Sequence, residues 1–271
     1  MRSPDNSALP IDSSVAHPAR RYDYLLGGKD NFAADREAAE KLIEIAPTAK
    51  VGALENRWFL HRAVRFLAGQ QGIRQFLDIG TGIPTSPNTH EIAQGIDPSA
   101  RVVYVDNDPL VLAHARALLA STPQGATAYI DADLRGPRQI LDDPGLVATL
   151  DLSRPVGVLL IAVLHFLVDA DDPRGIVATL VDAVPAGSWI AASHGTLEHL
   201  PQDKQAAIRS AMEKQAADRT GAEFAALFEH PRLELVAPGV QSVTQWWAED
   251  APQPRPPIED IGCNGLIARV R

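Results

Sequence analysis

Short apolar runs alternate with amphipathic segments from residue 75 onward. The apolar runs cover residues 75–79, 101–105, 127–130, 156–161 and 188–193. Strands that are apolar along their whole length are typical of a parallel sheet covered on both faces, because side chains pointing either way are then buried. The pattern therefore predicts an α/β fold with a doubly wound sheet.

The residues before the first apolar run have a different character. Residues 1–18 are mixed and rich in Pro and Ser, which predicts a flexible tail. Amphipathic segments at 33–45 and 51–68 predict two helices separated by Pro47. On the second helix, the side chains expected to be buried are Leu54, Trp58, Val64 and Leu67. Because residues 19–70 precede the first strand, we expect them to form an N-terminal helical cap.

The end of the chain adds a helix and two strands to this pattern. Residues 203–228 are predicted to be helical, and residues 233–236 and 266–270 to form strands. With the five earlier runs, these two strands predict a seven-stranded sheet. The predicted organisation is a tail at 1–18, a cap at 19–70 and an α/β domain at 71–271.

The first apolar run ends in a turn whose chemistry suits a bound ligand. The run Asp78-Ile79-Gly80-Thr81-Gly82 places glycine at alternate positions, where the backbone can adopt conformations that a Cβ would prevent. Ser86 and Pro87 match the N-cap and first position of a following helix. A crevice at the carboxyl end of a strand is where open α/β sheets bind nucleotides.

Asp106 ends the next predicted strand, 24 residues after Gly82. A carboxylate at this place in a nucleotide-binding fold accepts hydrogen bonds from both ribose hydroxyls, so we predict that role for Asp106, with Asn107 bordering the base. Asp108 and Pro109 then begin the next helix as N-cap and first residue. The alternative for Asp106 is an exposed acid that opens a turn.

Composition narrows the classes of function. Of the 271 residues 45% are hydrophobic, enough for a sizeable core, and the net charge of −9 disfavours a nucleic-acid partner. A single cysteine, Cys263, and no Cys/His cluster predict neither a disulfide nor a metal site. The N-terminus lacks the apolar core of a signal peptide, and no run approaches 18 apolar residues. We expect a cytoplasmic protein without a membrane partner.

The turn at residues 78–82 resembles the first motif of class I S-adenosylmethionine (SAM) dependent methyltransferases. The resemblance implies that Asp78, Gly80, Thr81 and Gly82 hold the methionine part of SAM as cofactor. An NAD fingerprint needs a third glycine at position 85, where this chain has Thr85. An NAD-linked oxidoreductase is therefore disfavoured.

Three segments narrow this resemblance. Residues 21–32, 76–85 and 102–109 together resemble an actinobacterial family of S-adenosyl methyltransferases formerly classed as a domain of unknown function. The similarity covers nearly the whole chain. It implies a Rossmann-like, class I methyltransferase sheet and SAM as cofactor, and it implies no particular methyl acceptor.

Two later segments complete the implied cofactor site. Asp133-Leu134, after the third strand, resembles the motif that contacts adenine, with Asp131 as the alternative carboxylate. Residues 161–167, which include Ala162 and His165, resemble the segment that lies under the cofactor in small-molecule methyltransferases. His165 is the candidate catalytic base, although a hydrogen-bonded structural histidine fits equally well.

The segment from residue 22 to residue 32 has the features of a lid over the cofactor, with Gly27-Gly28 as a hinge. The substrate-side candidates are Tyr22, Tyr24 and Asn31, together with Arg57 on the next helix, which we expect to meet a carboxylate. A helical arm used for dimer packing or stability is the alternative, so a homodimer stays open. Arg57, His61 and Arg65 also fit a solvated polar stripe.

We therefore predict a SAM-dependent methyltransferase that acts on a small molecule. Methyl transfer is an in-line displacement from a sulfonium, so positioning and desolvation can supply most of the rate without a strong base. The alternative is a non-catalytic SAM-binding sensor or regulatory protein, which would lack an acceptor pocket.

Overall fold

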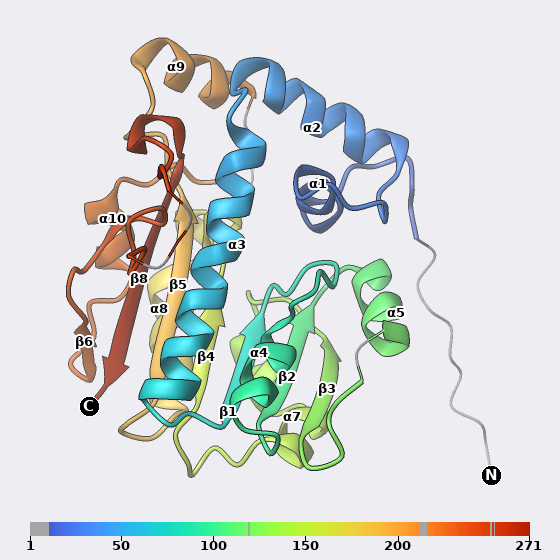
Figure 1. The fold of residues 1–271 in the computed structure, drawn as a ribbon, viewed down its shortest axis with the longest axis vertical. Coiled ribbons are helices and arrows are strands. Elements are labelled where there is room, and N and C mark those ends of the chain that lie inside the picture. Colours follow the sequence, from blue (N-terminus) through green and yellow to red (C-terminus); the bar gives the residue numbers. More distant parts are fainter. Residues whose placement is uncertain (1–10, 119, 212–215, 250, 252) are drawn as a thin grey trace.

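The computed structural model describes residues 11–118, 120–211, 216–249, 251 and 253–271. Within these residues a mixed sheet forms the centre of the fold, with helices on both faces (Figure 1). Its strands are β1 (Gln75–Ile79), β2 (Arg101–Asp106), β3 (Ala126–Asp131), β4 (Gly157–Leu160), β5 (Trp189–Gly195), β6 (Leu233–Leu235), β7 (Gln241–Ser242) and β8 (Cys263–Val270). The predicted α/β fold class is confirmed.

The strand order explains where a ligand can bind. The continuous path is β3-β2-β1-β4-β5-β8-β6, and the two-residue β7 pairs with β8 beside it. Strands β1 to β5 are parallel, whereas β8 is antiparallel to β5, β6 and β7. The described sheet thus has eight strands, one more than predicted, because β7 is added. The chain adds β2 and β3 on one side of β1 and then β4 and β5 on the other, so the strand order reverses between β1 and β4. Such switch points hold ligands in open α/β folds.

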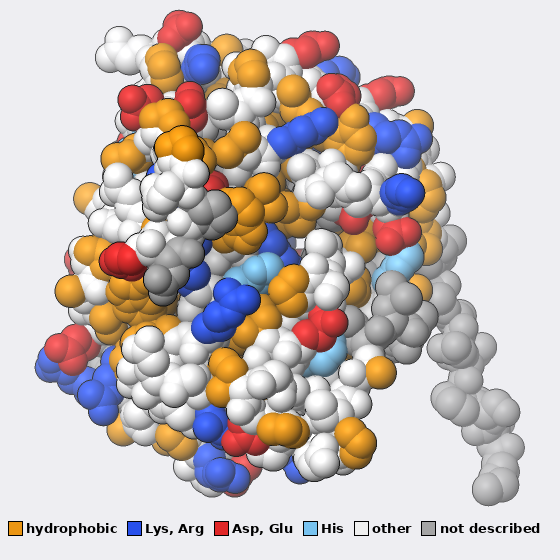
Figure 2. All heavy atoms as spheres, viewed as in Figure 1, with side chains coloured by type: hydrophobic (Ala, Val, Ile, Leu, Met, Phe, Trp, Pro, Cys, Tyr) orange, Lys and Arg blue, Asp and Glu red, His pale blue; other side chains and the backbone are white. Residues whose placement is uncertain are grey.

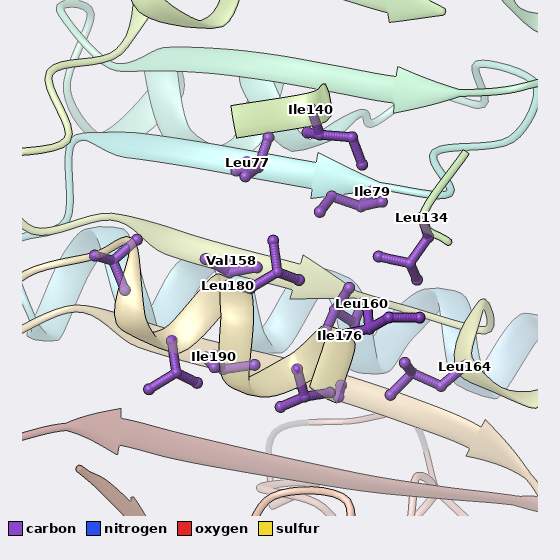
Figure 3. Close-up of a cluster of buried hydrophobic side chains, with 14 of the residues drawn as sticks. Leu77, Ile79, Leu134, Ile140, Val158, Leu160, Leu164, Ile176, Leu180 and Ile190 are labelled. Atoms are coloured by element: carbon purple, nitrogen blue, oxygen red, sulfur yellow. The ribbon is translucent and has the colours of Figure 1, made fainter. Parts of the chain in front are cut away.

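Two hydrophobic clusters cover the two faces of the sheet. On one face, Leu77, Val158 and Ile190 of the strands pack against Ile176 and Leu180 of α8 (Pro173–Asp182), as Figure 3 shows. This face is also covered by α6 (Pro137–Leu141), α7 (Pro144–Thr149) and α10 (Gly221–Ala226). The other face packs against α3 (Ala49–Arg65), the π-helical turn η1 (Phe66–Gln70) and α4 (Thr89–Ile96).

Two further helices lie over the end of the sheet at which the parallel strands finish. They are α1 (Pro18–Leu25) and α2 (Ala33–Ile45), hereafter the N-terminal helices (Figure 1). The predicted boundaries of α2 agree with the structure. Between these helices and the sheet edge lies α5 (Pro109–Leu118), whose Leu110 and Val111 pack with Ile83 and with Phe32.

Three helix predictions are wrong. The helix after the glycine turn begins at Thr89 and not after Ser86, because the backbone N–H of Asn88 is capped by Glu91 Oε2 at 2.6 Å. Leu54 is 41% exposed, since the buried face of α3 is the one that carries Phe59 and Ala63.

The third concerns residues 203–228, which were predicted as one helix. Residues 212–215 of that span lie outside the described part, and residues 216–220 are irregular. The structure has α9 (Gln202–Ala211) before them and α10 after them. The helices α6 and α7 were not predicted.

The surface carries charges of both signs. Figure 2 shows Lys, Arg, Asp and Glu side chains intermixed on one face, with hydrophobic side chains between them. Among the described residues, no helix combines the length and the apolar character needed to cross a membrane.

Candidate active site

The glycine turn after β1 has an open space above it. Gly80 and Gly82 have φ angles of +74° and +68°, in the left-handed region that favours glycine. A Cβ on Gly80 would lie 2.6 Å from Cγ2 of Val163, so the loop after β4 closes against this glycine. A Cβ on Gly82 would have nothing within 4 Å. The two glycines therefore have different roles, one in close packing and the other beside free space.

Asp106 stands at the edge of this space. Its Oδ2 accepts the N–H of Gly82 at 2.8 Å, and its Oδ1 accepts the N–H of Asp108 at 2.9 Å. Burial raises the pKa of Asp106, and these two N–H groups oppose that rise. Since each carboxylate oxygen can accept more than one hydrogen bond, Asp106 keeps capacity for a ligand's hydroxyl groups.

Asp78 lies beneath the same turn. Its Oδ2 accepts a hydrogen bond of 2.6 Å from the hydroxyl of Thr89, the first residue of α4. Burial raises the pKa of Asp78 to about 6, although Thr89 and the Arg57 guanidinium lower it. Asp78 is therefore a buried carboxyl whose protonation changes just below neutral pH.

Arg57 reaches the turn from α3. Its Nη2 donates to the carbonyl oxygens of Thr85 and Pro87, the second at 3.0 Å, so it holds the loop between the glycine turn and α4. Its Nε is buried without a partner among the described residues, and burial lowers its pKa. The side chain thus lies against the loop that follows the glycine turn, and its guanidinium is partly engaged by the protein's own backbone.

The residues predicted to face the adenine are joined to each other. Asn107 Nδ2 donates to Asp133 Oδ2 at 2.9 Å, and Arg135 lies 3.2 Å from the same oxygen. Leu134 is buried beside them. Asp131, the alternative, pairs with Asp106 through the β2–β3 backbone ladder and is exposed. The structure thus links Asp133 directly to the turn that follows β2.

The segment after β4 carries the predicted Ala162 and His165. Ala162 has a φ of +53°, which is unfavourable for a residue with a Cβ, and its N–H donates to Ser193 Oγ at 2.9 Å. His165 Nδ1 accepts a long hydrogen bond of 3.5 Å from the N–H of Gly195. Burial, with nearby His194, lowers the pKa of His165 to about 3, so its ring is neutral.

The N-terminal candidates have partners within their own region. Tyr22 donates to the carbonyl of Ala53 at 2.9 Å, and burial raises its pKa to about 12. Tyr24 donates to Glu40. Asn31 donates to Asp23 Oδ2 at 2.8 Å. A contact between these groups and an acceptor stays a prediction.

The double glycine has a role in local packing that does not involve a hinge. Gly27 has a φ of +82° just after α1, as expected at a helix end. The N–H of Gly28 donates to the carbonyl of Asp23 at 2.8 Å, and a Cβ on Gly28 would overlap the Asp23 carboxylate. The glycines therefore allow a tight loop around Asp23.

One contact beside the candidate site was not predicted from the sequence. Arg20 Nε donates to Asp108 Oδ2 at 3.1 Å across a separation of 88 residues. Asp108 was predicted only as a helix cap. Nothing in the spacing connects the two residues, and the one available signal was the pair of adjacent arginines, Arg20 and Arg21, before the two tyrosines of this segment. No group of three or more potential metal ligands occurs in the described part of the chain.

Comparison of the chain with known proteins identifies a family. Residues 4–271 match the family described as S-adenosyl methyltransferase. A DUF574 family protein from Streptomyces avermitilis is 48% identical, with a TM-score of 0.89 over 97% of this chain and 100% of that one. A proposed methyltransferase from Thermobifida fusca is 40% identical, with a TM-score of 0.86 over 96% and 97% of the two chains.

More distant structures share the fold alone. The mitomycin 7-O-methyltransferase MmcR is 14% identical, with a TM-score of 0.52 over 97% of this chain and 74% of that chain. No curated protein matches the chain.

Proposed function

The chain belongs to the S-adenosyl methyltransferase family, and we propose that it transfers a methyl group from SAM to a small-molecule acceptor. SAM is the cofactor of this family. The observation that carries the proposal is the open space at Gly82, which follows β1 beside the switch point and is bordered by the buried carboxylate of Asp106 at the end of β2.

The residues around this space fit the parts of SAM. We assign Asp106 to the ribose hydroxyls, because both its oxygens are already held in place and retain accepting capacity. The adenine is assigned to Asn107, Asp133 and Leu134, which adjoin that turn. The methionine part is assigned to the β1 and β4 ends, namely Asp78, Gly80, Thr81, Gly82 and Ala162.

Arg57 is proposed to work on the methionine side of the site. Its guanidinium spans two loop carbonyls, and it lowers the pKa of Asp78, which places positive charge near that carboxyl. A carboxylate at Arg57, as predicted from the sequence, would also satisfy its unpartnered Nε–H. Tyr24 and Asn31 would first have to release Glu40 and Asp23, so they are the weakest candidates for contact with the methyl acceptor.

When bound, SAM supplies an electrophilic methyl group on a sulfonium. The chain's own part in the reaction is to orient the acceptor and exclude water, because displacement at such a methyl does not require a strong base. A base with a pKa near 3 removes protons poorly at neutral pH. Since Nδ1 of His165 accepts from Gly195, its ring proton lies on Nε2, and we assign His165 to hydrogen-bond donation toward the acceptor.

Two measurements test the proposed function. Calorimetry should detect binding of SAM and no binding of NAD. Incubation with methyl-labelled SAM and a pool of small metabolites should then transfer label to an acceptor. Binding without transfer to any pool would contradict catalysis and favour a SAM-binding sensor, whereas NAD binding would contradict the cofactor assignment.

A further inference from the structure

Three buried charged side chains, Arg20, Asp35 and Asp108, form a cluster with the partly exposed His17 between the N-terminal helices and the turn after β2. Asp108 Oδ2 lies 3.1 Å from Arg20 Nε and 2.9 Å from His17 Nδ1. Asp35 Oδ2 lies 3.7 Å from Arg20 Nη1, and Asp35 Oδ1 accepts the N–H of His17 at 2.8 Å. The side chains of Arg20, Asp35 and Asp108 are 6%, 0% and 1% exposed.

Burying these charges is not an efficient way to stabilise a fold. The desolvation of both partners offsets much of their attraction, and well-packed apolar residues often do as well. The cluster instead fixes the orientation of the elements around it. Asp35 caps the start of α2 by accepting the N–H of Phe32 at 2.9 Å, and Asp108 caps α5 by accepting the N–H of Leu110 at 2.9 Å. The two carboxylates therefore fix two helix starts relative to Arg20.

One ring nitrogen of His17 lies near two groups. Nδ1 is 2.9 Å from Asp108 Oδ2 and 3.3 Å from the N–H of Ala19. A nitrogen cannot donate to the first and accept from the second at once. The shorter contact, to a carboxylate, places the proton on Nδ1, so His17 and Arg20 both donate to the same Asp108 oxygen.

The turn that this cluster holds also carries Asp106. The N–H of Asp108 donates to Asp106 Oδ1 at 2.9 Å, so the position of Asp108 sets one of the two hydrogen bonds that orient the Asp106 carboxylate. The other bond comes from the N–H of Gly82. A continuous path of hydrogen bonds thus runs from Arg20 on α1, through Asp108, to Asp106 at the open space.

We propose that Arg20 is a positioning residue that, through Asp108, aims the carboxylate of Asp106 at the ribose hydroxyls of the bound nucleoside. This inference rests on the role proposed above for Asp106. It gives the N-terminal helices a defined task, which is to hold one wall of the cofactor site rather than to open and close over it.

The geometry of the guanidinium explains why arginine is needed. Arg20 uses Nε toward Asp108 and Nη1 toward Asp35 and the carbonyl of Asp12 at 3.1 Å. Arginine offers these donors in a rigid planar fork, whereas lysine offers a single point charge on a flexible chain. Arg20→Lys therefore keeps the buried charge balance and removes the directed contact.

The test measures binding of S-adenosylhomocysteine and of its 2′,3′-dideoxyribose analogue by calorimetry. A residue that only supports the fold would change both affinities equally. We expect Arg20→Lys to weaken S-adenosylhomocysteine about tenfold and the 2′,3′-dideoxy analogue less than about twofold, because only the first has the hydroxyls that Asp106 must meet. Equal losses, or no loss, would overturn the proposal.

Arg36→Lys is the matched control. Arg36 is on α2 and donates through Nη1 to the carbonyl of Asn31 at 2.8 Å, without contact to Asp108. The same loss of a guanidinium should leave both affinities unchanged. A selective loss in Arg36→Lys equal to that in Arg20→Lys would also overturn the proposal.

Two further variants separate the possible failures. If Arg20→Lys does not fold, Asp108→Asn replaces it, because asparagine still caps α5 while the ionic contact with Arg20 is lost, and the same selective loss is expected. Asp106→Asn tests the premise. If wild type and Asp106→Asn bind the two ligands with the same preference, the ribose role of Asp106 is wrong and the Arg20 proposal falls with it. If only Asp106→Asn removes the preference, the fault lies with Arg20.

Discussion

The two sides of the switch point bury titratable groups of opposite kind. At the β1–β2 side, Asp78 and Asp106 are carboxyls whose pKa values burial raises. At the β4–β5 side, His165 and His194 are imidazoles whose pKa values burial lowers, to about 3 and about 4. Burial favours the neutral form in both cases, so the same physical cause shifts the two sides in opposite directions on the pH scale.

The partners of these groups show what each side can do. Asp106 is held by two backbone N–H groups and still has lone pairs for a ligand. His194 donates through Nδ1 to the carbonyl of Gly195 and accepts from Arg219 at Nε2, so both its nitrogens are used within the protein. The carboxylate side is therefore built to accept hydrogen bonds, and the histidine side is built around neutral rings.

The largest effect is expected from Gly80→Val, which disrupts the contact between the glycine turn after β1 and the loop after β4. A valine there must adopt a positive φ and overlap Val163, so we expect a loss of about 3 kcal/mol or more in the free energy of unfolding. Denaturant titration measures it. Gly82→Ala is the control, since its Cβ enters open space: it should cost only about 1–2 kcal/mol for the backbone strain and weaken SAM binding. Equal stability losses for both variants would contradict the different roles given to these glycines.

Asp78→Asn should change how stability depends on pH. The folded pKa of about 6 lies above the ordinary 3.8, so the folded state binds the proton more tightly, and the free energy of unfolding falls as pH rises from about 4 to about 6. Asparagine removes this term, so the variant should gain up to about 3 kcal/mol over wild type between pH 4 and pH 8. Urea titrations at both pH values measure the difference, and a parallel pH dependence of the two proteins would contradict a raised pKa.

The histidines should give the reverse slope. The pKa of His165 is depressed from 6.5 to about 3, so its contribution to stability is complete above pH 6.5 and is lost as pH falls toward 3. His165→Asn should therefore flatten the acid limb of the stability profile, which Asp78→Asn should leave in place.

Asp106→Ala tests the proposed ligand-binding role of the carboxylate side. It removes a charged acceptor at a strand end, so SAM binding should weaken by about 1.5–3 kcal/mol while the fold is kept. Calorimetry gives the affinity and circular dichroism the fold. Unchanged affinity in a folded variant would remove Asp106 from the site.

The smallest effect is expected on the rate of methyl transfer in His165→Gln. An orienting donor is partly replaced by the glutamine amide, so we expect a loss of less than about tenfold, against 10²–10⁴-fold for a lost general base. The rate is measured with labelled SAM at saturating acceptor. A thousandfold loss would show that His165 acts as a general base.

Much of this protein followed from local sequence. The alternation of apolar runs and amphipathic segments determined the α/β sheet, because side-chain periodicity depends only on backbone geometry. The glycine turn and the acid that ends β2 could also be predicted, because a positive φ favours glycine and because the end of an apolar run marks the end of a strand. The boundaries of α2 were found for the same reason.

What the sequence could not determine depends on residues far apart in the chain. Arg20 and Asp108 have no periodic relation across 88 residues, and only the packing of α1 over the strand ends brings them together. The exposure of Leu54 likewise depends on which side of α3 the sheet covers. The tautomer of His165 is decided by the N–H of Gly195 on the next strand. Local preferences therefore determined the helices, the strands and the glycine turn. The hydrogen-bond partners of the polar side chains, their burial and the positions of their protons were decided only by tertiary packing, which removed water from these groups.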